Sequence, residues 1–290
     1  MPDFLQRFHF QDTPVRGELC RLNDAHQTAL AKHDYPEPVA GLLGQAMLGV
    51  ALMTATLKLK GSLILQIQGD GPVGLIMAEC NQAGDVRAIA RFDADANYAD
   101  THWTTLTGSG RLLLTIEPDD GERYQGIVPL EGASLADALG YYFQQSEQLP
   151  TKFIFAANNE GAAGLMLQVL PGHDSGEDDD LWPRVTQLAA TVKNEELLGV
   201  DPEQLLYRLF HEESVELFPA TELRFKCTCS RERSANALVS LGVEELREVA
   251  AEQGGTINVD CQFCHQVYSF DSVDIEQLFQ PAADAPDSVQ

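Results

Sequence analysis

The sequence is poor in positive charge. Its 290 residues contain 19 lysines and arginines against 44 aspartates and glutamates, which gives a net charge of −25. A protein that binds nucleic acid needs cations to displace the counterions of the phosphates. The deficit of cations therefore argues against a nucleic-acid partner.

Motifs for nucleotide chemistry are also missing or incomplete. No G-x-x-x-x-G-K-[ST] segment occurs, so no ATP-driven activity is predicted. The segment GDGPVG at 69–74 fits G-x-G-x-x-G, but the strand-like LIMAEC follows it where a dinucleotide site needs a helix. We expect a hairpin turn there. No Ser/His/Asp constellation can be argued from the sequence, and we predict that the protein is not an enzyme.

The chain lacks the marks of export and of membrane insertion. Residues 1–11 have no apolar core behind a basic start, so we expect no signal peptide and a cytoplasmic location. Residues 39–57 carry no charge and approach the length of a membrane span. They contain Gln45, Thr54, Thr56 and three glycines, and no aromatic belt flanks them. We expect a buried core helix, a soluble protein and no membrane partner.

Residues 1–173 carry a mixture of strand and helix signals. A hairpin is predicted over 61–80 from its alternation and its glycine-rich turn. A helix is predicted over 134–148, with Ser134 as its N-cap. Further strands are expected at 85–92, 110–118 and 121–130, and a closing pair at 151–158 and 162–170. Adjacent hairpins without strand–helix alternation indicate an α+β fold with a largely antiparallel sheet.

Composition changes at the polar, acidic segment 171–180, which predicts a domain boundary. We predict an N-terminal α+β core over 1–173, an amphipathic helical linker over 174–222 and a small C-terminal zinc-binding domain over 223–290. Two helices are expected in the linker, the second with Asp201 as N-cap and Pro202 at its first position. Its apolar stripe should pack on the first domain, and consists of Leu205, Leu206, Leu209 and Phe210. A hydrolytic metal centre at His173-Asp174 and Asp178–Asp180 is less favoured than a solvated charge run.

Four of the six cysteines form two close pairs near the C-terminus. Cys227 and Cys229 make C-x-C, and after 31 residues Cys261 and Cys264 make C-x-x-C. Four sulfurs match the closed tetrahedral coordination of structural zinc, and TINVDCQFCHQVYSF resembles a strand, a knuckle and a strand. A structural zinc site, two disulfides, or a site that can be either all remain open. A zinc-ribbon nucleic-acid-binding regulator is the alternative function, and a C-x-x-C oxidoreductase ranks third because no βαβ context surrounds the pair.

The neighbours of the cysteine pairs refine this hypothesis. Four cations lie close to the first pair in sequence, where they could stabilise thiolates: Arg224, Lys226, Arg231 and Arg233. His265 is a possible substitute ligand, although four cysteines already suffice. Cys20 and Cys80 have no partner at ligand spacing, and we expect them to be small buried hydrophobic residues.

Blocks along almost the whole chain resemble those of one known family. They include YPEPVAGLLGQ, TLKLKGSLILQIQGDGP, AECNQAGDVRAIAR, YQGIVPLEG, YYFQQSEQLPT and GLMLQVLP, followed by the two cysteine pairs. Together they resemble the bacterial redox-regulated chaperones of the heat-shock protein 33 family. None of the four cysteines departs from the family pattern.

The resemblance implies a holdase that binds unfolding client proteins without ATP in the bacterial cytoplasm. In the reduced, inactive form, one zinc per chain would bind Cys227, Cys229, Cys261 and Cys264. Oxidation would form the disulfides Cys227–Cys229 and Cys261–Cys264, expel the zinc and unfold the linker. The active form would be a homodimer. Loss of zinc could have this effect because zinc binding contributes roughly 10–16 kcal/mol in small thiolate modules, whereas a core of this size supplies about 3–5 kcal/mol.

Overall fold

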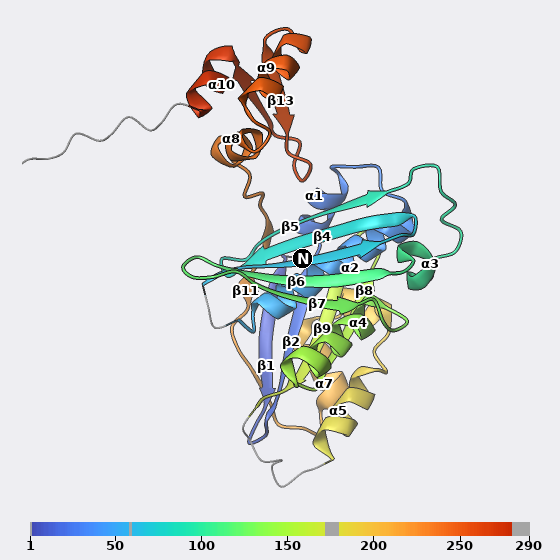
Figure 1. Ribbon diagram of the computed structural model, residues 1–290. Helices are drawn as coiled ribbons and strands as arrows, with labels where there is room; N and C mark the ends of the chain where they lie inside the picture. The colour runs from blue at the N-terminus through green and yellow to red at the C-terminus, as the bar shows by residue number, and fades with distance from the viewer. Residues whose placement is uncertain (1, 58–59, 172–179, 280–290) are drawn as a thin grey trace, which may run out of the picture. The chain divides into compact units, whose positions relative to one another are not determined.

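The structure is a computed structural model that describes residues 2–57, 60–171 and 180–279 (Figure 1). The chain divides into two compact units, residues 1–226 and residues 227–290. The predicted α+β class with largely antiparallel sheet is confirmed. The predicted boundary between residues 173 and 174 lies outside the described residues, and so do His173 and the acidic residues up to 179. The predicted domain limits therefore stay predictions.

The first sheet of the N-terminal unit, sheet A, has the strand order β10-β1-β2-β9-β8. Every pair in it is antiparallel, and a further short strand, β11, also pairs with β1. Its strands are β1 (Phe4–Phe10), β2 (Val15–Leu22), β8 (Thr151–Ala157), β9 (Ala162–Val169), β10 (Val215–Leu217) and β11 (Thr221–Glu222). The expected closing pair is therefore β8–β9. Linker residues complete the outer edge of this sheet.

The second sheet, sheet B, has the order β12-β5-β4-β3-β6-β7. The expected strands are all present, and GDGPVG connects β3 to β4 as a hairpin turn. The strands are β3 (Gly61–Gly69), β4 (Val73–Asn81), β5 (Asp85–Phe92), β6 (Gly110–Pro118), β7 (Tyr124–Pro129) and β12 (Arg224–Phe225). The short β12 is parallel to β5, so the residues just after the predicted linker are part of this sheet.

Helix α2 (Glu37–Thr54) packs against strands of both sheets. It has the length and hydropathy of a membrane span, but 78% of that window is buried inside the protein, as expected for a core helix. Helix α4 (Leu135–Tyr142) begins at Ser134, whose side chain accepts a hydrogen bond from the Asp137 backbone, and a π-helical turn, η1 (Phe143–Glu147), extends it. The short helices α1 (Asp24–Leu30) and α3 (Trp103–Thr107) complete this part of the unit.

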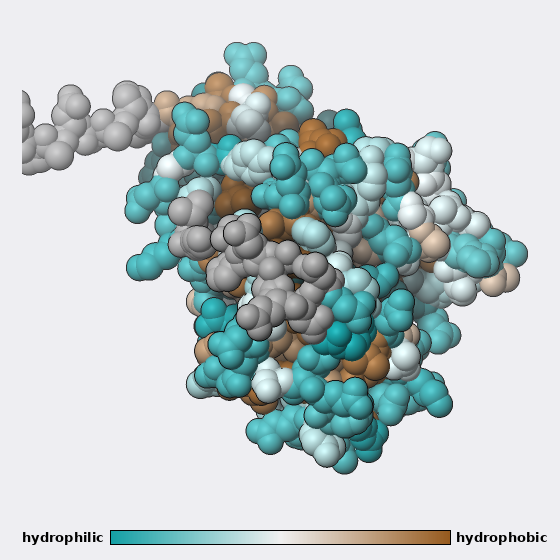
Figure 2. Space-filling model, turned by 90° about the horizontal axis from the view of Figure 1, so that it is seen from below, coloured by the Kyte–Doolittle hydropathy of each residue, from teal (hydrophilic) through white to brown (hydrophobic). Residues whose placement is uncertain are grey.

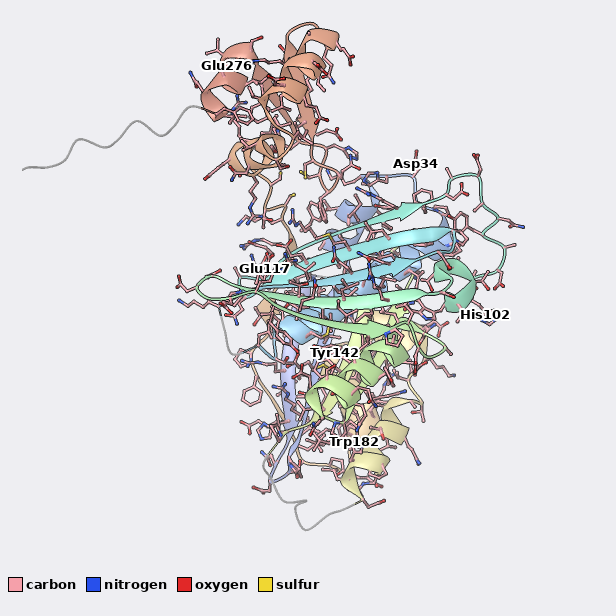
Figure 3. The ribbon with its side chains drawn as sticks, in the orientation of Figure 1. Asp34, His102, Glu117, Tyr142, Trp182 and Glu276 are labelled. Carbon is pink, nitrogen blue, oxygen red and sulfur yellow. The ribbon has the colours of Figure 1, made fainter. Side chains whose placement is uncertain are left out.

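Within its described residues, 180–222, the linker forms three helices where the sequence predicted two. They are α5 (Leu181–Ala189), α6 (Asn194–Gly199) and α7 (Pro202–Phe210). Helix α5 ends at the turn 190–193, and a capping interaction between Lys193 and Glu196 begins α6. The apolar periodicity of the sequence does not reveal this break between the two helices. Trp182 on α5, labelled in Figure 3, and other apolar residues of these helices pack on the face of sheet A opposite α2.

The C-terminal unit consists of α8 (Arg231–Val239), α9 (Val243–Glu252), the hairpin β13 (Thr256–Asp260) and β14 (Val267–Asp271), and α10 (Ser272–Leu278). Gly254 and Gly255, with φ of 75° and 95°, make the turn after α9 in a conformation that other residues rarely adopt. The described core of this unit is small, and Glu276, labelled in Figure 3, pairs with Arg247 at its surface. Its buried apolar residues are Ala235, Leu238, Leu246, Ala250, Ile257, Phe270 and Ile275.

Candidate metal centre

The structure brings the four clustered cysteines together. The sulfurs of Cys227, Cys229, Cys261 and Cys264 all lie within 4.8 Å of one another, and all four residues are partly buried. The Cys227 and Cys261 sulfurs are 3.6 Å apart, and those of Cys229 and Cys264 are 3.5 Å apart. Four sulfurs bound tetrahedrally at about 2.3 Å from a zinc ion would be separated by about 3.8 Å. This donor set can therefore hold a metal ion, and its spacing fits zinc.

Local backbone structure aims the second pair at this centre. The backbone N–H groups of Cys264 and His265 donate to the Cys261 carbonyl, and Cys261 N–H donates to the Gln266 carbonyl. His265 adopts a left-handed φ of 60°, which closes the tight turn between β13 and β14. The His265 side chain is exposed and is not part of the four-sulfur group, so the structure gives no support to its role as a substitute ligand.

The first pair lies in the extended segment before α8. Ser230 caps this helix by accepting a hydrogen bond from the Arg233 backbone. The Tyr268 hydroxyl of β14 lies 3.2 Å from the Cys229 sulfur and can donate a hydrogen bond to a thiolate there. Sequence reasoning did not identify Tyr268, because the contact depends on how the hairpin packs beside the C-x-C segment.

Burial and the neighbouring thiols affect how readily this cluster ionises. Burial raises the pKa of Cys261, and burial together with the neighbouring thiols raises the pKa of Cys264 to about 12. Four thiolates crowded within hydrogen-bond distance would repel one another. A divalent cation replaces the protons and offsets that repulsion, so metal binding and thiol ionisation occur together.

Two of the four cations that lie near the first pair in sequence form ion pairs with a carboxylate of sheet B. Arg224 and Lys226 direct their charged groups at Asp85 of β5, at 2.7 Å and 3.0 Å. The Asp85 side chain is only 5% exposed, so two cations just after the predicted linker hold one buried carboxylate of sheet B. We call this arrangement the Asp85 clamp. The residue that follows Lys226 is Cys227.

The other two cations stay in the C-terminal unit. Arg233 donates to the Thr228 hydroxyl, between the cysteines of the first pair. Arg231 pairs with Asp274 of α10 at 2.7 Å and lies over the Phe270 ring, 4.3 Å from its centroid. Arg231 therefore fixes α8 to the rest of the unit, in addition to placing charge near the cysteines.

The apolar stripe of the linker is buried in the N-terminal unit. Leu205, Leu206, Leu209 and Phe210 are 1%, 4%, 8% and 1% exposed, and they pack with residues of β1, β2 and β9. Tyr207 on the same helix is 71% exposed. Figure 2, which views the protein from below Figure 1, shows a mostly hydrophilic surface with smaller hydrophobic patches between the polar groups.

Cys20 and Cys80 are buried within the core between the two sheets, at 0% and 2% exposure, as the sequence predicted. Burial raises the pKa of Cys80 to about 12 and also raises the pKa of Cys20 well above its ordinary value. Both thiols therefore keep their protons at neutral pH and act as small apolar residues.

A family model described as "Hsp33 protein" matches residues 3–271. The chain belongs to the Hsp33 family. Relatives named "33 kDa chaperonin" include one from Ectopseudomonas mendocina (strain ymp), 50% identical over 290 residues, covering 99% of this chain and 98% of the relative. One from Azotobacter vinelandii (strain DJ / ATCC BAA-1303) is 50% identical over 281 residues, covering 96% and 94%.

A solved structure has the same fold. It is the 33 kDa chaperonin (Heat shock protein 33 homolog) of Thermotoga maritima, with a TM-score of 0.79 and 25% identity over 95% of this chain and 97% of that one. These comparisons confirm the resemblance found in the sequence blocks and make the protein an Hsp33-family chaperone. They favour a chaperone over a nucleic-acid-binding zinc ribbon.

Proposed function

We propose that this protein is an ATP-independent holdase that is inactive when reduced and metal-bound and is activated by oxidation. One observation carries the proposal: the four-thiol cluster begins at Cys227, directly after the Asp85 clamp, which holds the residues that follow the linker on sheet B. A chemical change at the cysteines is thus adjacent in the chain to a contact that keeps the linker in place.

In the reduced form, Cys227, Cys229, Cys261 and Cys264 would hold one zinc ion per chain. The ion would supply structural coordination and charge, while Tyr268 would stabilise the Cys229 thiolate by a hydrogen bond. Seven buried apolar residues make the described core of the C-terminal unit, which is little for an independent fold. We therefore expect the metal-bound cysteines to supply much of the stability of this unit.

Oxidation would convert each pair of thiols to a disulfide. Two cysteine thiolates form one S–S bond and lose two electrons, and one hydrogen peroxide takes up these electrons and two protons from solvent to give two waters. We propose the pairs Cys227–Cys229 and Cys261–Cys264. The sulfurs of Cys229 and Cys264 are 3.5 Å apart and those of Cys227 and Cys261 are 3.6 Å apart, as a tetrahedral set allows, and these distances do not by themselves favour one disulfide pairing. Once oxidised, the sulfurs no longer bind zinc as thiolates.

Unfolding of the C-terminal unit would then reach the linker through the chain itself. Residues 224–226 would lose an ordered neighbour, and the helices α5–α7 would leave sheet A. Their departure would uncover the apolar side chains of sheet A and those of the linker, which include Phe8, Phe10, Leu165, Leu205 and Phe210. Large exposed apolar surfaces bind unfolded proteins, and they also favour association of two chains into a homodimer.

The test is to measure zinc content and suppression of aggregation on one sample before and after peroxide. The reduced protein should hold one zinc per chain and leave aggregation of a heat-unfolded client unchanged. The oxidised protein should lose the zinc, suppress aggregation without ATP, and yield peptides linked as Cys227–Cys229 and Cys261–Cys264. A reduced sample that is equally active, or an oxidised one that keeps its zinc, would contradict the proposal.

A further inference from the structure

The outer edge of β1 in sheet A is covered by the linker of the same chain. Its inner edge pairs with β2 along most of its length. On the outer edge, Phe8, His9 and Phe10 pair with β10, and Phe4 and Leu5 pair with β11. The segment 215–222 thus shields a seven-residue strand that would otherwise end the sheet.

The hydrogen bonds show which backbone groups this segment satisfies. The Phe218 N–H donates to the Arg7 carbonyl at 2.9 Å, and the Gln11 N–H donates to the Ser214 carbonyl at 2.8 Å. In an antiparallel pair the N–H and C=O of one residue point to the same side. The odd-numbered residues of β1 therefore direct their backbone groups at the linker. If the linker leaves, these groups form an open edge that can pair with another strand.

The linker is a weak occupant of this edge. Strand β10 has three residues and β11 has two, and the ladder with β1 is interrupted between them. Together these strands pair with five of the seven residues of β1. A continuous extended segment could pair with the whole strand.

We infer that the edge of β1 binds an extended segment of an unfolding client as an added antiparallel strand, and that β10 is a built-in competitor for it. The inference rests on the proposed function, because the edge opens only when the linker leaves. Val215 and Leu217 lie opposite Phe10 and Phe8 and pack in the same apolar cluster. The edge therefore suits client segments in which apolar residues alternate with polar ones.

The side chains of this segment that point away from the apolar cluster indicate which polar or aromatic client residues the edge would prefer. Glu216 points away from the apolar cluster, and its carboxylate lies 3.5 Å from His9 Nε2. The His9 ring also stacks on Phe218, with 5.4 Å between the ring centroids. An acidic or aromatic residue at these alternate positions of a client would find the same partners.

A peptide with the sequence of residues 214–223, SVELFPATEL, tests the inference when it carries a fluorescent label. Its binding to the full chain is followed by fluorescence anisotropy. The peroxide-oxidised, metal-depleted protein should bind it at least about tenfold more tightly than the reduced protein, whose edge is occupied. Guanidinium-unfolded lysozyme with blocked thiols should displace it. Two isomeric peptides supply the matched control.

The first isomer is N-methylated at Glu216 and Phe218, whose N–H groups face β1, and the second at Val215 and Leu217, whose N–H groups face away. The first should bind at least about tenfold more weakly than the second, because it loses two backbone hydrogen bonds. Equal binding of the isomers would overturn the inference. A second result would also overturn it: the peptide dissociates an oxidised dimer but is not displaced by the lysozyme. The edge of β1 would then bind a second copy of the chain and not a client.

Suppression of aggregation is measured on the same oxidised sample. If suppression is present and the isomers bind equally, the edge inference fails while the proposed function stands. If suppression is absent, the proposed function fails. In that case the edge inference is tested with the Leu206→Ser/Phe210→Ser variant, which is designed to release the linker without oxidation. A difference in binding between the two isomers supports the inference, and equal binding overturns it.

Discussion

Replacing Leu206 and Phe210 by serine should release the linker from sheet A without any change at the cysteines. Both side chains are almost fully buried, and the Phe210 ring lies 5.1 Å from that of Phe10 and 6.2 Å from that of Phe8. Burying a side chain of this kind contributes about 1.5–3 kcal/mol. The double change should therefore weaken the docking of the linker by about 3–6 kcal/mol, or about two to four orders of magnitude in its equilibrium.

The assay is limited proteolysis of the reduced, metal-replete protein, with zinc content and suppression of client aggregation measured in parallel. The double variant should be cleaved faster within 181–222, keep its zinc, and suppress aggregation without oxidation. Tyr207→Ser is the matched control, since Tyr207 lies on the same helix and is 71% exposed. A double variant that matches this control in cleavage and stays inactive would refute the argument that the stripe holds the linker on the sheet.

Three further perturbations test other parts of the structure. Cys261→Ser should abolish tight zinc retention in the reduced protein, as measured by metal analysis after dialysis; one zinc per chain in the variant would contradict the four-sulfur site. Asp85→Asn should speed proteolytic cleavage near residues 224–226 and leave the zinc content unchanged, because it weakens hydrogen bonds that involve a charged group, each worth about 1.5–3 kcal/mol. The control is Glu117→Gln on the same sheet, which should have no effect because Glu117 forms an exposed pair with Arg123. Glu18 is fully buried, has no hydrogen-bond partner within the described residues, and has its pKa raised by burial to about 8 from 4.5. The folded protein thus keeps a proton that the unfolded chain releases, so the free energy of unfolding should fall by up to about 1.4 kcal/mol per pH unit between about pH 5 and pH 7.5. Denaturant unfolding of Glu18→Gln should show a flatter pH dependence, and an unchanged slope would refute this role.

Much of the fold follows from local patterns in the sequence. The strands at 85–92 and 110–118 appear with their predicted bounds, because alternation over eight or nine residues is a strong signal. Ser134 and Asp201 cap their helices as predicted, since capping depends on the nearest backbone N–H groups. The two close cysteine pairs predicted that four sulfurs could lie at one centre, and the second pair is held by a tight turn between β13 and β14.

The remaining features depend on contacts between distant segments. Strands β10, β11 and β12 have two or three residues each, which is too short for any periodicity to show. They are strands only because the edges of β1 and β5 offer unpaired backbone groups. The Asp85 clamp and the Tyr268–Cys229 contact likewise join residues 141 and 39 positions apart.

The sequence by itself determined the α+β class and the family and predicted that the four cysteines form one cluster, since each depends on residue type and short-range spacing. Only the tertiary structure decided that Arg224 and Lys226 hold Asp85. It also decided that α2 covers one face of sheet A and the linker helices cover the other, and that the linker pairs with the edge of β1. The physical reason is that burial and pairing depend on which surfaces meet after folding. One amphipathic pattern is compatible with many partners until the packed chain selects one.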